Sequence, residues 1–399
     1  MPSFARHAGQ LAESETLAIA AKANALKAQG VKVAPFAAGE PDFPTPAHIC
    51  EAAIAAIRAG RTKYTASAGI LPLREAVARR MASLGFDGVT PDRTMVSVGA
   101  KGVLFLALQV LLEEGDEAVV PSPCWLSYGK MIEAAGARPV YVATRPEDGF
   151  TLDPERVRAA LTPRTRVILL NSPGNPTGAV LSDDVQRAIG RLAVERGLHV
   201  VSDEIYEDLV YAPARFRSFA ALCPEAREST LVVSGVSKAY AMTGWRIGYG
   251  AGPKDLIQRM VRLQSHALSG PPDICQAAAL AALTGPQDEV ARMRAVFEKR
   301  RDLLHQGIAA LPDVSCRRPD GAFYALPDVS AWFKRSFRGR RVADATTLAE
   351  MLLEHAHAAV VPGDPFEAPY AVRFSYACSE DDIRQGLARV ADFARQLTG

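Results

Sequence analysis

The sequence predicts an α/β protein with a mostly parallel sheet flanked by helices and a second, smaller α/β domain. From about residue 95 onward, short β-branched runs alternate with stretches of helical pattern. Strands that alternate with helices are typical of a parallel sheet covered on both faces. Beyond about residue 284 the alternation gives way to a long charged helix and mixed structure. We therefore expect a large domain over residues 46–284 and a small domain built from residues 1–45 and 285–399.

The first part of the chain predicts two helices separated by an irregular segment. An alanine-rich amphipathic pattern covers residues 14–28 and stops at Gly30. A second helical pattern covers residues 46–59 and is followed by Gly60. Residues 39–46 (GEPDFPTP) contain three prolines, which prevent a regular element between the two helices.

The alternating part of the chain predicts where the chemistry lies. Ligands of parallel sheets bind beyond the carboxyl ends of the strands. Asn171, Asp203 and Gly235 each follow an expected strand closely, so we expect a site at that edge from residues far apart in sequence. The expected strands are residues 95–98, 118–121, 167–170, 198–202 and 231–234, and the expected helices are 99–112, 182–196 (N-cap Ser182) and 289–308.

Composition limits the classes of function. The 399 residues are 48% hydrophobic and 23% charged, which is ordinary for a soluble globular protein. The net charge of +2 indicates neither a nucleic acid nor an anionic membrane as a partner. Six scattered cysteines without CxxC spacing indicate neither a zinc site nor a redox dithiol and favour a reducing compartment.

The chain shows no signal-peptide layout and no apolar stretch of membrane-spanning length, so we expect a cytoplasmic location. His355 and His357 are two positions apart and do not share a helix face, so no metal site is expected there. We interpret the basic run 335–341, which lies within the unusually basic segment 333–347, as a solvated loop rather than a binding patch.

Lys238 lies in the most informative run of the chain, residues 237–246 (SKAYAMTGWR). A lysine amine can form a Schiff base with an aldehyde cofactor when burial or a neighbouring cation lowers its pKa. Arg246, in the same run, can hold the phosphate of such a cofactor. Taken alone, however, a lysine is usually a surface charge, so the interpretation depends on other residues that point to the same pocket.

Asp203 is one such residue, in the run 202–206 (SDEIY) at the end of an expected strand. A carboxylate there can pair with a pyridine nitrogen and keep it protonated, which makes the ring an electron sink. Tyr206 can donate to a ring oxygen from the same turn. Alternatively, Asp203 is an ordinary helix N-cap.

Small residues open the helix expected at 99–112. Gly99, Ala100 and Lys101 expose backbone N–H groups at the positive end of the helix dipole, which favours an anion such as phosphate. Because glycine before a helix is common, this signal is weak alone.

Three further side chains have a functional and a structural interpretation. Asn175 is held in the rigid loop 171–178 (NSPGNPTG), which presents an amide or is simply a tight turn. Trp125 either stacks on a cofactor ring or packs in the core. Arg373, inside an apolar strand, either binds a carboxylate through both nitrogens or forms a buried ion pair.

Five motifs together carry a resemblance: residues 38–43 (AGEPDF), 171–178, 202–206, 237–246 and 373–376 (RFSY). In these motifs, their order and their separations, the chain from about residue 14 to residue 397 resembles the pyridoxal-phosphate-dependent aminotransferases of fold type I. It is most similar to the bacterial aspartate aminotransferase group. Cys124, Gly174 and Ser234 depart from residues that are frequent in that group, and these departures bear on the substrate range.

The resemblance implies roles around the cofactor, pyridoxal 5′-phosphate. Lys238 would form the Schiff base and move the proton, Asp203 would hold the pyridine nitrogen, and Trp125 would stack on the ring. The ring oxygen would be held by Tyr206 and Asn175, and the phosphate by Arg246, Ser237, Gly99, Ala100 and Lys101. Tyr64 would reach the phosphate of a partner subunit, which implies a homodimer with shared sites.

The resemblance also implies substrate contacts. Arg373, Asn175, Trp125 and the backbone of Gly39 would bind the substrate around its α-carboxylate, and a distal carboxylate would meet Lys101, Ser14 and Thr16. The implied reaction moves an amino group from an L-amino acid, aspartate or glutamate, to a 2-oxo acid such as 2-oxoglutarate by a ping-pong mechanism. The alternatives are prephenate, aromatic or alanine-type substrates, a β-lyase or decarboxylase of the same fold, and a regulatory protein that keeps the cofactor without turnover.

Overall fold

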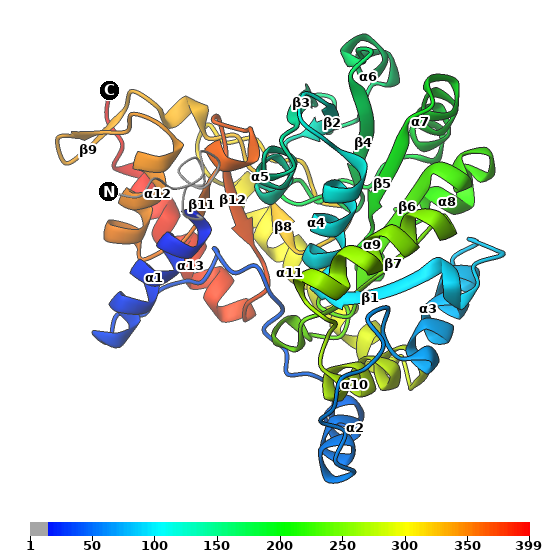
Figure 1. Ribbon diagram of the computed structural model, residues 1–399. Helices are drawn as coiled ribbons and strands as arrows, with labels where there is room; N and C mark the ends of the chain where they lie inside the picture. The colour runs from blue at the N-terminus through cyan, green and yellow to red at the C-terminus, as the bar shows by residue number, and fades with distance from the viewer. Residues whose placement is uncertain (1–14) are drawn as a thin grey trace, which may run out of the picture.

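The computed structural model describes residues 15–399 and is built around a seven-stranded sheet (Figure 1). Its strands are β1 (Thr94–Val98), β2 (Glu117–Ser122), β3 (Arg138–Ala143), β4 (Thr165–Asn171), β5 (His199–Asp203), β6 (Thr230–Gly235) and β7 (Ile247–Ala251). They lie in the order β1-β7-β6-β5-β4-β2-β3. Only β7 runs antiparallel to its neighbours. The prediction of a mostly parallel α/β sheet is confirmed.

Helices cover both faces of this sheet, because successive side chains of a strand point to opposite faces and the central strands are apolar on both. On β4, Val167 and Leu169 join a core that includes α4 (Gly99–Leu111), α5 (Ser127–Ala134) and α9 (Lys254–Ala267). Ile168 and Leu170 point the other way, to the core that includes α6 (Pro154–Ala160), α7 (Asp183–Arg196) and α8 (Phe219–Leu222). The helices α2 (Ala47–Arg58), α3 (Leu71–Ser83) and α10 (Asp273–Thr284) pack together near β1.

The remaining elements form a second group, which occupies the left of Figure 1 and reaches its centre with α11 and β8. Its antiparallel sheet has the order β11 (Val361–Pro362), β12 (Val372–Ser375) and β8 (Tyr324–Ala325). Around it lie α1 (Glu15–Ala28), α11 (Asp288–Ala309), α12 (Ala345–Ala356) and α13 (Glu380–Arg395). Short 3₁₀ turns occupy Pro91–Arg93, Pro224–Ser229, Thr243–Trp245, Ser330–Trp332 and Asp364–Phe366.

The helix expected at 182–196 is confirmed as α7, and the hydroxyl of Ser182 accepts a hydrogen bond from the backbone N–H of Val185 at 3.3 Å. The basic segment differs from the expected loop, because Ser336–Phe337 (β9) and Arg340–Arg341 (β10) pair as a hairpin. The side chain of Arg340 contacts Glu350 and Glu354 on α12, which gives the hairpin charged partners to fold against.

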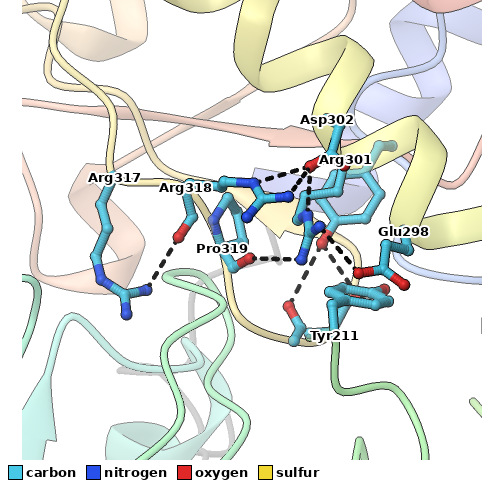
Figure 2. A network of polar contacts seen from close by, with 10 residues as sticks. Tyr211, Glu298, Arg301, Asp302, Arg317, Arg318 and Pro319 are labelled. Atoms are coloured by element: carbon cyan, nitrogen blue, oxygen red, sulfur yellow. Dashed lines mark hydrogen bonds and ion pairs between the residues drawn. The ribbon is translucent and has the colours of Figure 1, made fainter. Parts of the chain in front are cut away.

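A buried arginine connects the two groups of elements (Figure 2). Arg301 on α11 is 1% exposed, and its guanidinium donates to Asp302, to Glu298 and, at 3.5 Å, to the carbonyl of Pro319. The same guanidinium lies 4.8 Å from the ring centroid of Tyr211, which follows β5. The adjacent N–H groups of residues 320 and 321 donate to the carbonyl of residue 178 at 2.9 Å, which fastens this segment to the loop after β4.

Candidate functional site

A cavity of about 700 Å³ opens beyond the carboxyl ends of β4, β5 and β6 and is lined by residues from both groups of elements. This is the edge where the sequence placed the chemistry. Among the residues around the cavity are the predicted site residues Gly39, Ala100, Lys101, Trp125, Asn175, Asp203, Tyr206, Ser237, Lys238, Arg246 and Arg373. The structure therefore brings together side chains that are spread over more than three hundred positions of sequence.

Lys238 lies just beyond β6, and its amine donates to the carbonyl of Gly39 at 2.6 Å. Burial and the nearby guanidinium of Arg373 lower the pKa of Lys238 to about 8, although Glu40 and Asp203 oppose the shift. A primary amine with a pKa near 8 is partly unprotonated at neutral pH and can act as a nucleophile or a base.

Asp203 ends β5 and is 3% exposed. Its Oδ2 accepts a hydrogen bond from the hydroxyl of Tyr128 at 2.7 Å, and its Oδ1 accepts one from the N–H of Ile205 at 3.2 Å. Burial raises the pKa of Asp203 to about 6, and these hydrogen bonds and Lys238 limit the rise. The carboxylate is thus a buried anion that can pair with a protonated group in the cavity.

Arg373 on β12 is 3% exposed and has an incomplete set of partners. Its Nη1 donates to the side-chain oxygen of Asn175 at 3.1 Å, and its Nη2 donates to the carbonyl of Ala37 at 3.2 Å. The Nε of Arg373 has no hydrogen-bond partner within residues 15–399. A buried guanidinium without a carboxylate partner is suited to bind an anionic ligand.

Asn175 is held in place by its own loop. Its N–H donates to the side-chain oxygen of Asn171 at 2.9 Å, and the amide nitrogen of Asn171 donates to the carbonyl of Asp203 at 3.0 Å. The loop after β4 and the end of β5 are therefore joined by side-chain hydrogen bonds, which fixes the distance between Asn175 and Asp203.

Tyr206 shares a hydrogen bond with Tyr324, whose hydroxyl oxygen lies 3.2 Å away. Tyr324 also donates to the carbonyl of Gly39 at 3.4 Å, and its ring lies under the guanidinium of Arg373 at 4.4 Å. Burial raises the pKa of Tyr206 well above its usual value, so this phenol is neutral and able to donate.

The start of α4 forms a cradle for an anion. Gly99 has φ +74, and a Cβ built there would lie 2.6 Å from Nη2 of Arg246, so only glycine leaves the arginine in place. The N–H of Gly99 donates to the carbonyl of Arg246 at 3.0 Å, and Val98 gives the helix no side-chain cap, so the next N–H groups, those of Ala100 and Lys101, are not used by a capping side chain. With Ser237 beside them, these N–H groups and Arg246 match the donors that a phosphate requires.

Lys101, in the first turn of α4, and Trp125 lie together on the wall of the cavity. The amine of Lys101 lies 4.7 Å from the ring centroid of Trp125, and the same ring meets Tyr128 edge-on at 5.3 Å. Burial and the charge of Arg246 lower the pKa of Lys101. The indole thus faces the cavity and also supports a cation.

Some predicted residues lie elsewhere. Tyr64 is 94% exposed and does not line the cavity of its own chain. Ser14 and the side chain of Thr16 lie outside the described residues. Gly39 presents its carbonyl to Lys238 rather than to a carboxylate, so any contact of Gly39 with a substrate carboxylate would use its N–H.

Three site residues were missed by the sequence reasoning: Tyr128, Tyr324 and Glu40. Tyr128 follows Trp125 by three positions, a helical spacing that could have suggested it. Glu40 lies in the quoted run 38–43 and accepts a hydrogen bond from the hydroxyl of Thr243 at 2.6 Å. Tyr324 carried no local signal, because its partners are distant in sequence.

The part of the chain that the structure describes holds no group of three or more His, Cys, Asp or Glu side chains that could bind a metal ion. Within the same residues, no helix has both the length and the apolar character needed to cross a membrane.

The family model for class I and II aminotransferases matches residues 31–390. An aspartate aminotransferase of Geobacillus stearothermophilus is 44% identical over 98% of this chain and 98% of its own. An aspartate/prephenate aminotransferase of Thermus thermophilus is 46% identical over 100% of this chain and 99% of its own. The solved aspartate aminotransferase of Rhizobium meliloti superposes with a TM-score of 0.95 at 40% identity, covering 100% of both chains. The Thermus thermophilus aspartate aminotransferase solved with maleate gives 0.92 at 46% identity, covering 98% of this chain and 100% of its own.

Proposed function

Since the chain belongs to the class I and II aminotransferase family, we propose that it uses pyridoxal phosphate to move the amino group of a dicarboxylic L-amino acid to a 2-oxo acid. One observation carries the proposal: a lysine whose pKa is lowered to about 8 shares a cavity with a buried aspartate and with a buried arginine whose Nε has no hydrogen-bond partner within residues 15–399. Bound pyridoxal phosphate supplies an aldehyde that captures amines and a ring that withdraws electrons.

The residues of the chain that would hold the cofactor match its parts. The phosphate would be held by the α4 N–H groups, Ser237 and Arg246. The carboxylate of Asp203 would pair with a protonated ring nitrogen. Tyr206 is a neutral donor for the ring oxygen, and Trp125 offers a flat face.

Lys238 would move the proton of the reaction. Its Nζ, once unprotonated, would take the proton from the substrate Cα as a general base and would then, as a general acid, donate it to the carbon that the cofactor aldehyde supplies. Positioning comes from Arg373, which holds the α-carboxylate with the help of Asn175 and so orients the Cα–H bond. Alternation of the two half-reactions on one site gives ping-pong kinetics, with 2-oxoglutarate as the expected acceptor.

Lys101 is the residue that favours a dicarboxylic substrate. Its amine lies over Trp125 on the wall of the cavity, where it could bind a distal carboxylate. A charge-assisted bond to a distal carboxylate is worth about 1.5–3 kcal/mol. The Thermus thermophilus relative was solved with maleate, itself a dicarboxylate, which agrees with aspartate or glutamate as the donor.

A second candidate substrate is prephenate, which is in the name of the Thermus thermophilus relative. It is supported by a wall of small side chains that leaves room for a bulky ring-bearing carboxylate, formed by Ala23, Pro35, Ala37 and Ala359.

We further propose a homodimer, in which the exposed phenol of Tyr64 reaches the cofactor phosphate of the partner subunit. The proposed domains are residues 46–284 and residues 1–45 with 285–399, and the proposed location is the cytoplasm. Sedimentation of the wild-type chain should give twice the monomer mass, and a monomer with full activity would refute the shared site.

The test is a panel of amino acids mixed one by one with the reconstituted protein, read by the absorbance change of a single half-reaction. Aspartate and glutamate should react at least tenfold faster than alanine or phenylalanine. Prephenate is a 2-oxo acid, so it is tested in the second half-reaction, as an acceptor, against protein that has already taken up an amino group. Faster reaction of prephenate than of 2-oxoglutarate there, or of an aromatic amino acid in the panel, would favour the second candidate, and release of ammonia and pyruvate would indicate a β-lyase.

The Lys238→Ala variant serves as the negative control for the panel, because it should lose turnover and the adduct that borohydride traps on this side chain. Lys130→Ala, which removes an exposed lysine paired with Glu133, should retain both. Steady-state turnover by the Lys238→Ala variant would end the proposal.

A further inference from the structure

Tyr128 lines the cavity beside Trp125, and its hydroxyl has one hydrogen-bond partner within residues 15–399, the carboxylate of Asp203. It lies in the first turn of α5, is 1% exposed, and its hydroxyl donates to Oδ2 of Asp203 at 2.7 Å. The ring of Trp125 stands across it at 88°, and the N–H of Tyr128 donates to the carbonyl of Trp125 at 3.0 Å. The phenol is therefore held in one orientation by its own turn and by a neighbouring aromatic face.

We propose that Tyr128 is a positioning residue, whose buried hydroxyl keeps the Asp203 carboxylate ionised and aimed at the ring nitrogen of the cofactor. This inference rests on the proposed function, in which Asp203 pairs with a protonated pyridine. Tyr128 does not touch the reacting atoms on this account; it acts only through the carboxylate.

Burial makes such support necessary. It raises the pKa of Asp203 to about 6, while the hydrogen bonds from Tyr128 and Ile205 and the charge of Lys238 act against the rise. The other titratable groups near this pair are Tyr206 and Cys124, and burial raises the pKa of both. Lys238 is thus the only cation that the described residues place among the causes of the Asp203 shift.

Loss of the Tyr128 hydroxyl would raise the pKa of Asp203 to neutral pH or above. A hydrogen bond to a charged group is strong enough to move a carboxyl pKa by about one to two units. Without Tyr128, Asp203 would change from mostly ionised to at least half protonated at pH 7. A protonated carboxyl cannot pair with a protonated ring nitrogen, so the cofactor would bind less tightly at that pH.

The experiment measures the dissociation constant of pyridoxal phosphate between pH 5 and pH 8.5 for the stripped full-length protein and its Tyr128→Phe variant. In the wild type, the affinity for pyridoxal phosphate should decrease as the pH is lowered, with a midpoint near the pKa of Asp203. In the variant this midpoint should move up by about one to two pH units, while the affinities at pH 8.5 should agree within about threefold.

The matched control is Tyr376→Phe. It removes a buried hydroxyl that donates to the carbonyl of Ala322 at 3.2 Å and does not contact Asp203, so its midpoint should equal that of the wild type. An unchanged midpoint in a folded Tyr128→Phe variant would overturn the inference. Wild-type protein that binds no cofactor at any pH would instead overturn the proposed function.

A second variant covers the case in which Tyr128→Phe does not fold. Site-specific incorporation of 3-fluorotyrosine at position 128 keeps the ring and makes the hydroxyl a stronger donor. The midpoint should then move to lower pH, and a midpoint at or above the wild-type value would equally overturn the role of Tyr128.

Discussion

At the scale of single residues, Arg373 shows how burial gives one side chain its chemistry. Two of its nitrogens are occupied by Asn175 and the carbonyl of Ala37, and its Nε has no partner in the described chain. Burial lowers the pKa of this guanidinium, which marks the cost of keeping it charged without an anion beside it. A substrate carboxylate would supply that anion.

Arg373→Lys should therefore lower kcat/KM for every amino acid, mainly through KM. The ammonium of lysine is a point charge and replaces a planar, two-point donor. We expect a loss of about tenfold to a hundredfold, equivalent to about 1.5–3 kcal/mol, in steady-state kinetics across the panel. Arg301→Lys, at a buried arginine away from the cavity, should leave KM unchanged. An effect on a single substrate would show that Arg373 does not bind the common α-carboxylate.

Glu204 is a second residue whose surroundings set its protonation. Its Oε1 accepts hydrogen bonds from Ser202, Ser218 and the N–H of Phe219, while its buried Oε2 has no partner within residues 15–399. Burial, followed by the charge of Glu207, raises the pKa of Glu204 to about 8. The folded protein thus binds a proton here that the unfolded chain releases above about pH 4.5.

This excess proton makes the contribution of Glu204 to stability fall as the pH rises from about 4.5 to about 8. Glu204→Gln should flatten that part of the curve by a few kcal/mol when urea unfolding is followed from pH 5 to pH 8. The comparison variant is Glu117→Gln, because hydrogen bonds from Arg138 and Thr162 lower the pKa of buried Glu117. The stabilising contribution of Glu117 has the opposite pH dependence, because it is present at neutral pH and lost in acid. Equal curves for wild type and Glu204→Gln would contradict a neutral Glu204.

The sequence located most of the site at this scale, since Lys238, Asp203 and Arg373 stand in runs whose residue types suggest chemistry. Their roles stay predictions, but the structure does place them around one cavity. Tyr324 could not be found in the same way, because its hydroxyl contact is with Tyr206, far away in sequence. Tyr128 has only its spacing from Trp125 as a local signal, and its contact with Asp203 is likewise distant in sequence.

At the scale of elements, β7 is a strand that the sequence pattern did not reveal. Its residues 247–251 include Gly248 and Gly250, and glycine weakens any strand pattern. A Cβ at Gly248 would lie 2.0 Å from the backbone nitrogen of Ala100, so the close approach of α4 to the sheet excludes every larger residue. β7 therefore has glycine at two positions for a packing reason and keeps a single β-branched residue, Ile247, whereas β4 and β6 have several.

The start of α4 offers a test of its own. Gly99→Ala should lower stability by about 1–2 kcal/mol, because φ is +74, and should also weaken cofactor binding by displacing Arg246. Gly197→Ala at the end of α7 is the matched variant, with φ +63 and open space around its Cβ position. It should lose similar stability and keep wild-type cofactor affinity. Chemical denaturation and cofactor titration of both variants would separate the loss of stability from the loss of cofactor affinity. Equal cofactor affinities of Gly99→Ala and Gly197→Ala would argue against the anion cradle at the start of α4.

At the scale of the whole molecule, the cavity depends on how the two groups of elements are joined. The predicted division into domains at residues 46 and 284 stays a prediction. The structure does show that the core around β4 also includes side chains of α11, α12 and α13, so one apolar core crosses the junction. Sequence pattern cannot reveal such a junction, because its contacts join segments far apart in the chain.

Arg301→Met should weaken this junction. The change removes a buried guanidinium that donates to two carboxylates and to the carbonyl of Pro319, which predicts a loss of about 1.5–3 kcal/mol in the free energy of unfolding. Arg318→Met removes a half-exposed partner of the same Asp302 and should cost less than about 1 kcal/mol. Urea denaturation of the two variants would decide, and equal losses would show that burial of Arg301 adds nothing.

The reversed direction of β7 has a consequence for how the protein acquires its catalytic machinery. Because β6 runs toward the cavity and β7 runs away from it, the short connection between them delivers Lys238 and Arg246 together. Such a hairpin closes over few residues and loses little chain entropy. The nucleophile and the anion clamp could therefore become neighbours early in folding, before the slower long-range docking that adds Arg373.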